Sequence, residues 1–250
     1  MPNVALYCAL DARDRPTVER LAHLLAPAVG GLKLGLEYFC AHGPEGVSAV
    51  RAAGRSLFLD LKLHDIPNTV AGAVRSVVAL EPHYLTIHAA GGVAMMQAAR
   101  EAAAEEAARR GVAPPNLLGV TVLTSLDAAT LARQGVAGSA HDQVLRLAGL
   151  AHEAGLAGVI ASPHEVATLR AAHGPDFHIV VPGIRPASGA GSGKGDQARV
   201  ATPADAARAG ATALVVGRPI TQAPDPLAAA RAIGDEIAAS RVSAREIEES

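Results

Sequence analysis

The stretch LFLDLKLHDIPNT, Leu57 to Thr69, combines a strand pattern with a cluster of charges. Leucine occupies every second position of its first half, and strand side chains alternate between the two faces of a sheet. The leucines therefore share one face, while Asp60 and Lys62 share the other. Pro67 favours the start of a helix, because proline is tolerated at the first helical position. The stretch predicts one strand-to-helix unit with ionisable groups at the end of its strand.

The same alternation of strand and helix continues along the whole chain. Strand-like apolar runs cover residues 4–10, 31–36, 56–63, 84–89, 117–124, 158–163, 178–184 and 213–220. Longer amphipathic stretches separate them, and glycines at 54, 111, 155, 174 and 210 mark helix ends. Eight such units predict a parallel (β/α)8 TIM barrel, a single domain over residues 1–250. An open doubly wound sheet is the alternative, but residues 11–14 read DARD where its G-x-G-x-x-G turn belongs.

Composition narrows the class of protein. Half of the 250 residues are apolar, which allows a large core, and the net charge of −2 implies no broad field for nucleic acid. No apolar run approaches the roughly 18 to 20 residues needed to cross a bilayer, and the N-terminus shows no signal-peptide pattern. Cys8 and Cys40 lie in apolar runs, as reduced core cysteines do. We expect a cytoplasmic protein that binds neither nucleic acid nor membrane.

Two segments stand apart from the barrel pattern. The glycine-rich segment 186–203 follows the seventh strand and is long for such a loop, which favours a lid over an ordinary surface loop. It is not a P-loop, because Ser188 replaces the first glycine and Gly195 replaces the final Ser or Thr. The tail, residues 239–250, is polar and charged, and we expect it to fray.

Ionisable and polar residues collect at the ends of the predicted strands, where barrel enzymes place their chemistry. Buried ion pairs add little net stability, so a self-satisfied salt-bridge cluster is the weaker interpretation. A lysine between carboxylates stays protonated, which suits Lys62 to donate a proton to a carbanion. The strand-end residues are Asp11, Lys33, Asp60, Lys62, His88, Thr124, Ser125, Arg185, Gly217 and Arg218.

Three groups of motifs carry a family resemblance. DLKLHDIPNT, GLKLGLE upstream, and VPGIRP, GDQARVATP and VVGRPIT downstream closely resemble the orotidine 5′-phosphate decarboxylase family over residues 11–222. The resemblance implies conversion of orotidine 5′-phosphate to uridine 5′-phosphate, the last step of de novo pyrimidine nucleotide synthesis. It implies no metal and no organic cofactor. The loop from Arg185 to Gln197 departs from the family pattern in being longer and richer in glycine.

The resemblance also assigns roles to residues of this chain. Lys62 would protonate the C6 carbanion, with Asp60 and Lys33 completing the charged network. Asp65 would enter the site of a partner subunit, which implies an obligate homodimer with shared sites. His88 is expected to pack or support other groups, without a catalytic role. The implied substrate contacts are Asp11 and Lys33 to ribose, Ile66 and Thr69 beside Asp65, Thr124 and Ser125 near ribose and pyrimidine, and Arg185, Gln197, Gly217 and Arg218 to phosphate.

Two other functions remain open. A magnesium-dependent keto-sugar-phosphate decarboxylase of the same superfamily would need an acidic metal ligand at the end of the second strand, where this chain has Lys33. A catalytically silent nucleotide-binding barrel is the other alternative, and the intact set Asp60, Lys62 and Asp65 argues against it. A test of whether activity depends on magnesium would distinguish the first alternative. A turnover assay run beside a measurement of nucleotide binding would distinguish the second.

Overall fold

Eight parallel strands form a closed barrel in sequence order, in a computed structural model that describes residues 4–186 and 201–248. Each strand pairs with the next, and β8 returns to β1. This confirms the predicted (β/α)8 barrel. The strands are β1 (Ala5–Ala9), β2 (Gly31–Gly35), β3 (Ser56–Leu63), β4 (Tyr84–His88), β5 (Asn116–Val120), β6 (Gly158–Ile160), β7 (His178–Pro182) and β8 (Ala213–Val216).

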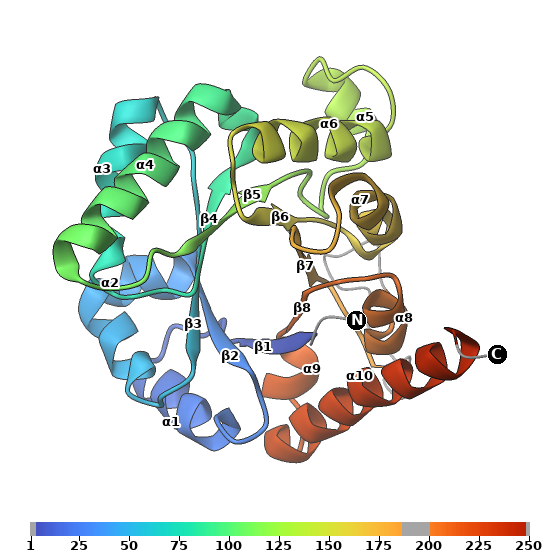
Figure 1. Ribbon diagram of the computed structural model, residues 1–250. Helices are drawn as coiled ribbons and strands as arrows, with labels where there is room; N and C mark the ends of the chain where they lie inside the picture. Colours follow the sequence, from blue (N-terminus) through green and yellow to red (C-terminus); the bar gives the residue numbers. More distant parts are fainter. Residues whose placement is uncertain (1–3, 187–200, 249–250) are drawn as a thin grey trace.

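Helices surround the strands on the outside of the barrel (Figure 1). α10 packs against α8 and α9, and it also contacts α1 across the closure of the barrel. The helices are α1 (Arg15–Leu25), α2 (Leu36–Arg51), α3 (Pro67–Val78), α4 (Gly92–Arg110), α5 (Ala128–Arg133), α6 (Ala140–Glu153), α7 (Val166–His173), α8 (Pro203–Arg208), α9 (Arg218–Thr221) and α10 (Pro226–Glu248), with short 3-10 turns η1 (Ala89–Gly91) and η2 (Pro163–Glu165).

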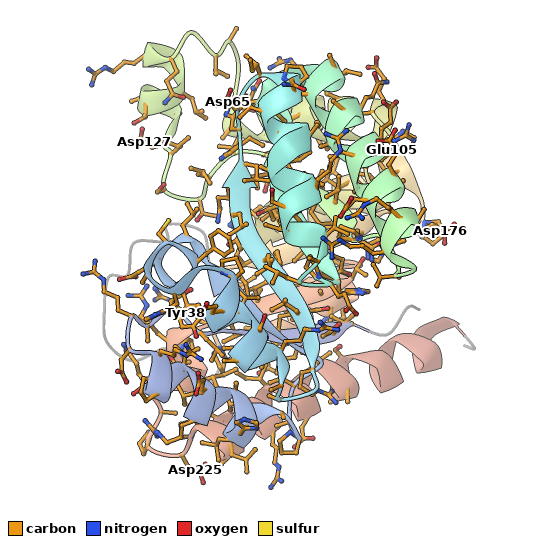
Figure 2. All side chains as sticks on the ribbon, turned by 90° about the vertical axis from the view of Figure 1, so that its left-hand side faces the viewer. Tyr38, Asp65, Glu105, Asp127, Asp176 and Asp225 are labelled. Carbon is orange, nitrogen blue, oxygen red and sulfur yellow. The ribbon has the colours of Figure 1, made fainter. Side chains whose placement is uncertain are left out.

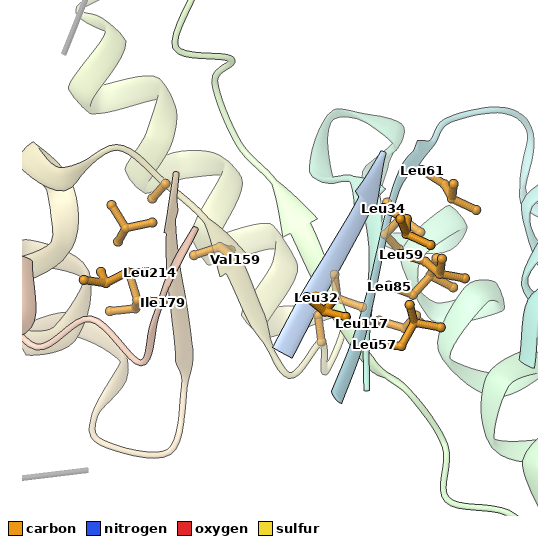
Figure 3. Close-up of a cluster of buried hydrophobic side chains, with 14 of the residues drawn as sticks. Leu32, Leu34, Leu57, Leu59, Leu61, Leu85, Leu117, Val159, Ile179 and Leu214 are labelled. Carbon is orange, nitrogen blue, oxygen red and sulfur yellow. The ribbon is translucent and has the colours of Figure 1, made fainter. Parts of the chain in front are cut away.

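The alternation in β3 places its side chains as the sequence predicts. Leu57, Leu59 and Leu61 are buried in the layer between barrel and helices, beside Leu34 of β2 and Leu85 of β4 (Figure 3). Burying a leucine side chain contributes about 1.5–3 kcal/mol, so this face fixes the register of β3 against its neighbours.

Aromatic rings fill the barrel interior below the site. Tyr7, Phe58 and Tyr84 meet with ring centroids 5.5 to 5.8 Å apart. Gly31 is required beside them, because a Cβ there would stand 2.1 Å from Cε1 of Tyr7. This apolar layer closes the barrel from inside and leaves its other end for polar groups.

The ends of the helices follow the sequence signals. The five glycines expected at helix ends all have positive φ, and α3 begins at Pro67. The side chain of Asp14 caps α1 by accepting a hydrogen bond from the Thr17 amide. α2 contains a break at Gly43, whose φ of 57° interrupts the helix before Pro44.

Several sequence-based boundaries were wrong. The predicted strands at 117–124, 158–163 and 213–220 continue too far, since β5 ends at Val120, β6 at Ile160 and β8 at Val216. The apolar residues that follow, such as Val122 and Ala161, line the mouth of the barrel and do not extend the sheet. Apolar character alone does not distinguish a residue in a strand from one that lines the mouth of the barrel.

One further expectation needs correction. Cys40 is exposed on α2, so only Cys8 is a core cysteine. The tail expected to fray, residues 239–250, overlaps the end of α10, which continues as far as Glu248. Among the described residues, no helix is long and apolar enough to cross a membrane.

Candidate active site

A cavity of about 1110 Å³ opens at the carboxyl ends of the strands. Charged side chains line it on several sides, and an apolar wall comes from the loop after β5 and from the ends of β6 and β7. The charged members are Asp11, Lys33, Asp60, Lys62, Arg185, Arg218 and Glu236. The apolar wall includes Val122, Leu123, Ile160 and Pro182.

Four of these side chains form a line of alternating charge. Lys33 Nζ lies 3.2 Å from Asp11 Oδ1 and 3.5 Å from Asp60 Oδ2. Lys62 Nζ lies 2.7 Å from the same oxygen of Asp60. The sequence-based expectation that these strand ends aim their charges at one small volume is therefore met.

Asp60 is the centre of this line and is largely buried, with a side-chain exposure of 13%. Burial raises the pKa of the Asp60 carboxyl, but Lys33, Lys62 and hydrogen bonds from Lys62 and Thr86 outweigh it, so the pKa falls below its ordinary value. Asp60 is thus a fixed carboxylate, and each lysine ammonium has a negative partner.

The backbone at Lys62 departs from a regular strand. Its φ of 49° lies in the left-handed region, which non-glycine residues rarely adopt. The pairing of β3 with β4 shifts register between Leu59 and Leu63. Such bulges re-aim side chains and are common near active sites. The sequence pattern alone, which is regular here, did not predict this one.

Asp65 lies away from this line of charges within the same chain. It is exposed in the turn before α3, and its Oδ1 accepts a hydrogen bond of 2.7 Å from the Ile66 amide (Figure 2). Ile66 is 67% exposed, although it is apolar, and Thr69 is also exposed. None of the three lines the cavity of its own chain.

The substrate-contact candidates from the later strands divide into two groups. Thr124, Arg185, Gly217 and Arg218 all line the cavity. Ser125 is exposed and does not line it, because β5 ends at Val120 and the chain turns outward toward α5.

Most of the segment 186–203, the expected lid, and Gln197 within it lie outside the described residues. The two described ends of the segment meet, since Ile184 pairs with Ala201 and the Arg185 amide donates to the Ala201 carbonyl at 3.2 Å. The segment therefore starts and ends at one place beside the cavity.

Two contacts hold the loop after β1, which carries Asp11. Arg13 forms an ion pair with Glu37 at the start of α2. His42 Nε2 lies 2.5 Å from the Arg13 carbonyl oxygen, and its ring packs against Tyr38 with a centroid distance of 4.8 Å and an interplanar angle of 53°. These residues were not predicted from the sequence, because Glu37 and His42 are 24 and 29 residues from Arg13 along the chain and only the fold brings them together.

His88 packs against His64, with ring centroids 5.3 Å apart, and does not line the cavity. Burial, His64 and Lys62 lower the pKa of His88, against an opposing effect of Asp60. Within the described part of the chain, no group of three or more His, Cys, Asp or Glu side chains is placed to hold a metal ion.

The model of the orotidine 5′-phosphate decarboxylase / HUMPS family matches residues 5–233. The chain belongs to this family. It is 55% identical over 233 residues to an orotidine 5′-phosphate decarboxylase of Anaeromyxobacter sp. (strain K), covering 93% of this chain and 97% of that one. It is 53% identical over 232 residues to that of Paramagnetospirillum magneticum, covering 93% and 97%.

A solved structure agrees with this assignment. The crystal structure of orotidine 5′-phosphate decarboxylase from Lactobacillus acidophilus matches with a TM-score of 0.83 at 37% identity, covering 94% of this chain and 99% of that one. The family resemblance found in the motifs is confirmed, and the chain is an enzyme of the orotidine 5′-phosphate decarboxylase family, a carboxy-lyase.

Proposed function

We propose that the protein converts orotidine 5′-phosphate to uridine 5′-phosphate and carbon dioxide, with neither metal nor organic cofactor. This reaction is the last step of de novo pyrimidine nucleotide synthesis. The observation that carries the proposal is the line of charge from Asp11 through Lys33 and Asp60 to Lys62, at the mouth of a barrel of this family.

Lys62 is the proposed proton donor. When the bond between C6 of the pyrimidine and its carboxylate breaks, carbon dioxide leaves and the electron pair stays on C6. The Lys62 ammonium then gives a proton to C6 and becomes a neutral amine, which solvent reprotonates. Its Nζ is held 2.7 Å from Asp60 Oδ2, so the donor is oriented before the reaction begins.

Asp60 adds a second effect on the same step. It is a buried carboxylate, and the substrate carboxylate placed beside it would be repelled. That repulsion is lost when neutral carbon dioxide departs, so the interaction favours the transition state over the bound substrate. Lys33 keeps Asp60 ionised and links it to Asp11.

The rest of the cavity fits the remainder of the nucleotide. Asp11 and Lys33 are proposed to bind the ribose hydroxyls, and the apolar wall with Thr124 is proposed to hold the pyrimidine; all of them line the cavity. Arg185 and Arg218 supply positive charge after β7 and β8, where barrels commonly bind phosphate. Gln197 is proposed to reach the phosphate from the lid.

We also infer a homodimer with shared sites. Asp65, Ile66 and Thr69 are exposed and outside the cavity of their own chain, which is what residues serving a partner's site require. Ile66 is 67% exposed, so its apolar side chain is accessible to a partner subunit. The location inferred is the cytoplasm, since Cys8 and Cys40 are both free thiols.

The test is turnover of orotidine 5′-phosphate, followed by its loss of absorbance in buffer containing a chelator. We expect full activity under these conditions and no gain on adding magnesium. Activity that requires magnesium would favour the keto-sugar-phosphate alternative. Tight nucleotide binding in calorimetry without any turnover would instead indicate a silent barrel.

A further inference from the structure

The irregular part of β3 is joined to β4 by one buried side chain. Leu59 pairs with Leu85 and Leu63 pairs with Ile87, so β3 places Asp60, Leu61 and Lys62 opposite Thr86 alone. Extra residues in one strand leave backbone groups without ladder partners. The Lys62 amide is one of these groups, and its partner is a side chain.

Thr86 makes two hydrogen bonds at this place. Its Oγ1 accepts from the Lys62 amide at 2.9 Å and donates to Asp60 Oδ1 at 2.9 Å. The hydroxyl thus uses its single proton on the carboxylate and a lone pair on the amide. Thr86 is fully buried, with 0% exposure, so water does not compete for either bond.

The two bonds act on both ends of the Asp60–Lys62 pair. Asp60 Oδ1 is held by Thr86, which leaves Oδ2 to face Lys62 Nζ and Lys33 Nζ. At the other end, the Lys62 amide is held while its backbone keeps the left-handed φ of 49°. Such a conformation is rare for a residue with a side chain and persists only where surrounding contacts enforce it.

We propose that Thr86 is a positioning residue for the reaction: its hydroxyl fixes the Asp60 carboxylate and the bulged Lys62 backbone together, and so sets the direction in which Lys62 delivers its proton. Thr86 does not line the cavity, so it acts through Asp60 and Lys62 and does not touch the substrate. This inference rests on the proposed role of Lys62.

The decisive variant is Thr86→Val, which keeps the shape of the side chain and removes the hydroxyl. We expect kcat to fall about 10- to 100-fold, the loss typical of one hydrogen bond to a charged group. The KM for orotidine 5′-phosphate and the affinity for uridine 5′-phosphate should change less than about 3-fold, because the ligand contacts remain. Thr86→Ser restores the hydroxyl, and its kcat should stay within about 3-fold of wild type.

A matched control is Thr121→Val. Thr121 is also a buried threonine at a strand end, but its hydroxyl donates to the Ile160 carbonyl at 2.8 Å, away from the charged line. If loss of any buried hydroxyl lowered kcat through general loosening, both valine variants would show it. We expect the Thr121→Val variant to keep the wild-type kcat.

Hydrogen exchange at the Lys62 amide tests the geometry without relying on turnover. Exchange should be slow in wild type and in Thr86→Ser, and at least about 10-fold faster in Thr86→Val. Unchanged exchange and unchanged kcat in Thr86→Val would overturn the inference. If the wild-type protein did not decarboxylate orotidine 5′-phosphate but exchange at the Lys62 amide were still faster in Thr86→Val, the structural link would be supported and only the proposed function would be contradicted.

Discussion

The Lys62 ammonium and the Asp60 carboxylate lie 2.7 Å apart, on residues separated by a single position in β3. The pair is part-buried, and Lys33 approaches the same carboxylate oxygen at 3.5 Å. With Asp11 beside Lys33, the line holds two ammonium groups and two carboxylates, and Lys62 is its positive end. The Lys62 ammonium is therefore the positive group available to a carbanion that forms on the substrate.

Two variants distinguish proton donation by Lys62 from a role that needs only its positive charge. Lys62→Ala should lower kcat by about 100- to 10,000-fold, the range expected for a general acid. Lys62→Arg keeps a positive charge beside Asp60, but a guanidinium hardly gives up its proton, so it should be nearly as inactive. The measurement is the kcat of both variants, determined by steady-state kinetics.

Binding of uridine 5′-phosphate to both Lys62 variants serves as the control for folding. If Lys62→Arg retained more than about a tenth of the wild-type kcat, the positive charge alone would suffice and proton donation by Lys62 would be wrong.

The shared-site dimer predicts recovery of activity between two inactive variants. Lys62→Ala and Asp65→Ala subunits should each be inactive alone. In a mixed dimer, one site carries both lesions and the other carries neither, so random exchange should restore about a quarter of the wild-type activity per site. The measurement is turnover after exchange, verified by mass spectrometry of tagged subunits.

The control for this exchange is a mixture of two Lys62→Ala preparations with different tags, which should stay inactive. Verified mixed dimers without activity would contradict the assignment of Asp65 to the partner's site.

We expect the protein to lose stability in acid because of two histidines at the amino-terminal end of the barrel. Burial lowers the pKa of His83, and burial with His83 and Arg170 lowers the pKa of His178. His178 Nδ1 lies 2.8 Å from the Tyr84 hydroxyl. The unfolded chain therefore binds protons more readily than the folded one, and the free energy of unfolding should fall as pH drops below about 6.5.

His178→Gln should make this fall shallower, because glutamine keeps a polar partner for Tyr84 and does not titrate. Urea unfolding at pH 5, 6, 7 and 8, at one protein concentration, gives the slopes. His23→Gln, at an exposed position of α1, is the matched control and should leave the slope unchanged. Equal slopes in the wild-type protein and the His178→Gln variant would show that His178 does not contribute to the loss of stability in acid.

The sequence predicts the barrel well because its signals are local and repeated. The alternation in β3, Pro67 at the start of α3 and the glycines after five helices each act within a few residues. The charged side chains at the strand ends could be found for the same reason, since parallel strands of a barrel all end on one side.

The features that the sequence did not predict depend on distant contacts. The bulge at Lys62 arises from pairing with β4, and the run from Leu57 to Leu63 carries no sign of it. Thr86 looks like an ordinary strand former, so only its position opposite Asp60 and Lys62 reveals its hydrogen bonds.

The remaining prediction concerns the proposed phosphate clamp, with Arg218 as its main contact. Arg218 begins α9 directly after β8 and lines the cavity. Removing a charged hydrogen-bond partner costs about 1.5–3 kcal/mol, roughly 10- to 100-fold in kcat/KM. Arg218→Ala should therefore lower kcat/KM for orotidine 5′-phosphate by this amount, and should leave the much slower reaction of the bare nucleoside orotidine almost unchanged. Arg208→Ala, an exposed arginine of α8 that pairs with Asp205, is the matched control and should affect neither substrate.

Free phosphite extends the same prediction to the wild-type enzyme. If phosphate binding contributes to catalysis at the distant C6 atom, phosphite that fills the empty clamp should speed the decarboxylation of orotidine. The activation should be lost in Arg218→Ala and kept in Arg208→Ala. Equal damage by Arg218→Ala on the nucleotide and the nucleoside would instead show that Arg218 supports the fold or the chemistry at C6, because a residue that only holds phosphate has nothing to hold in orotidine.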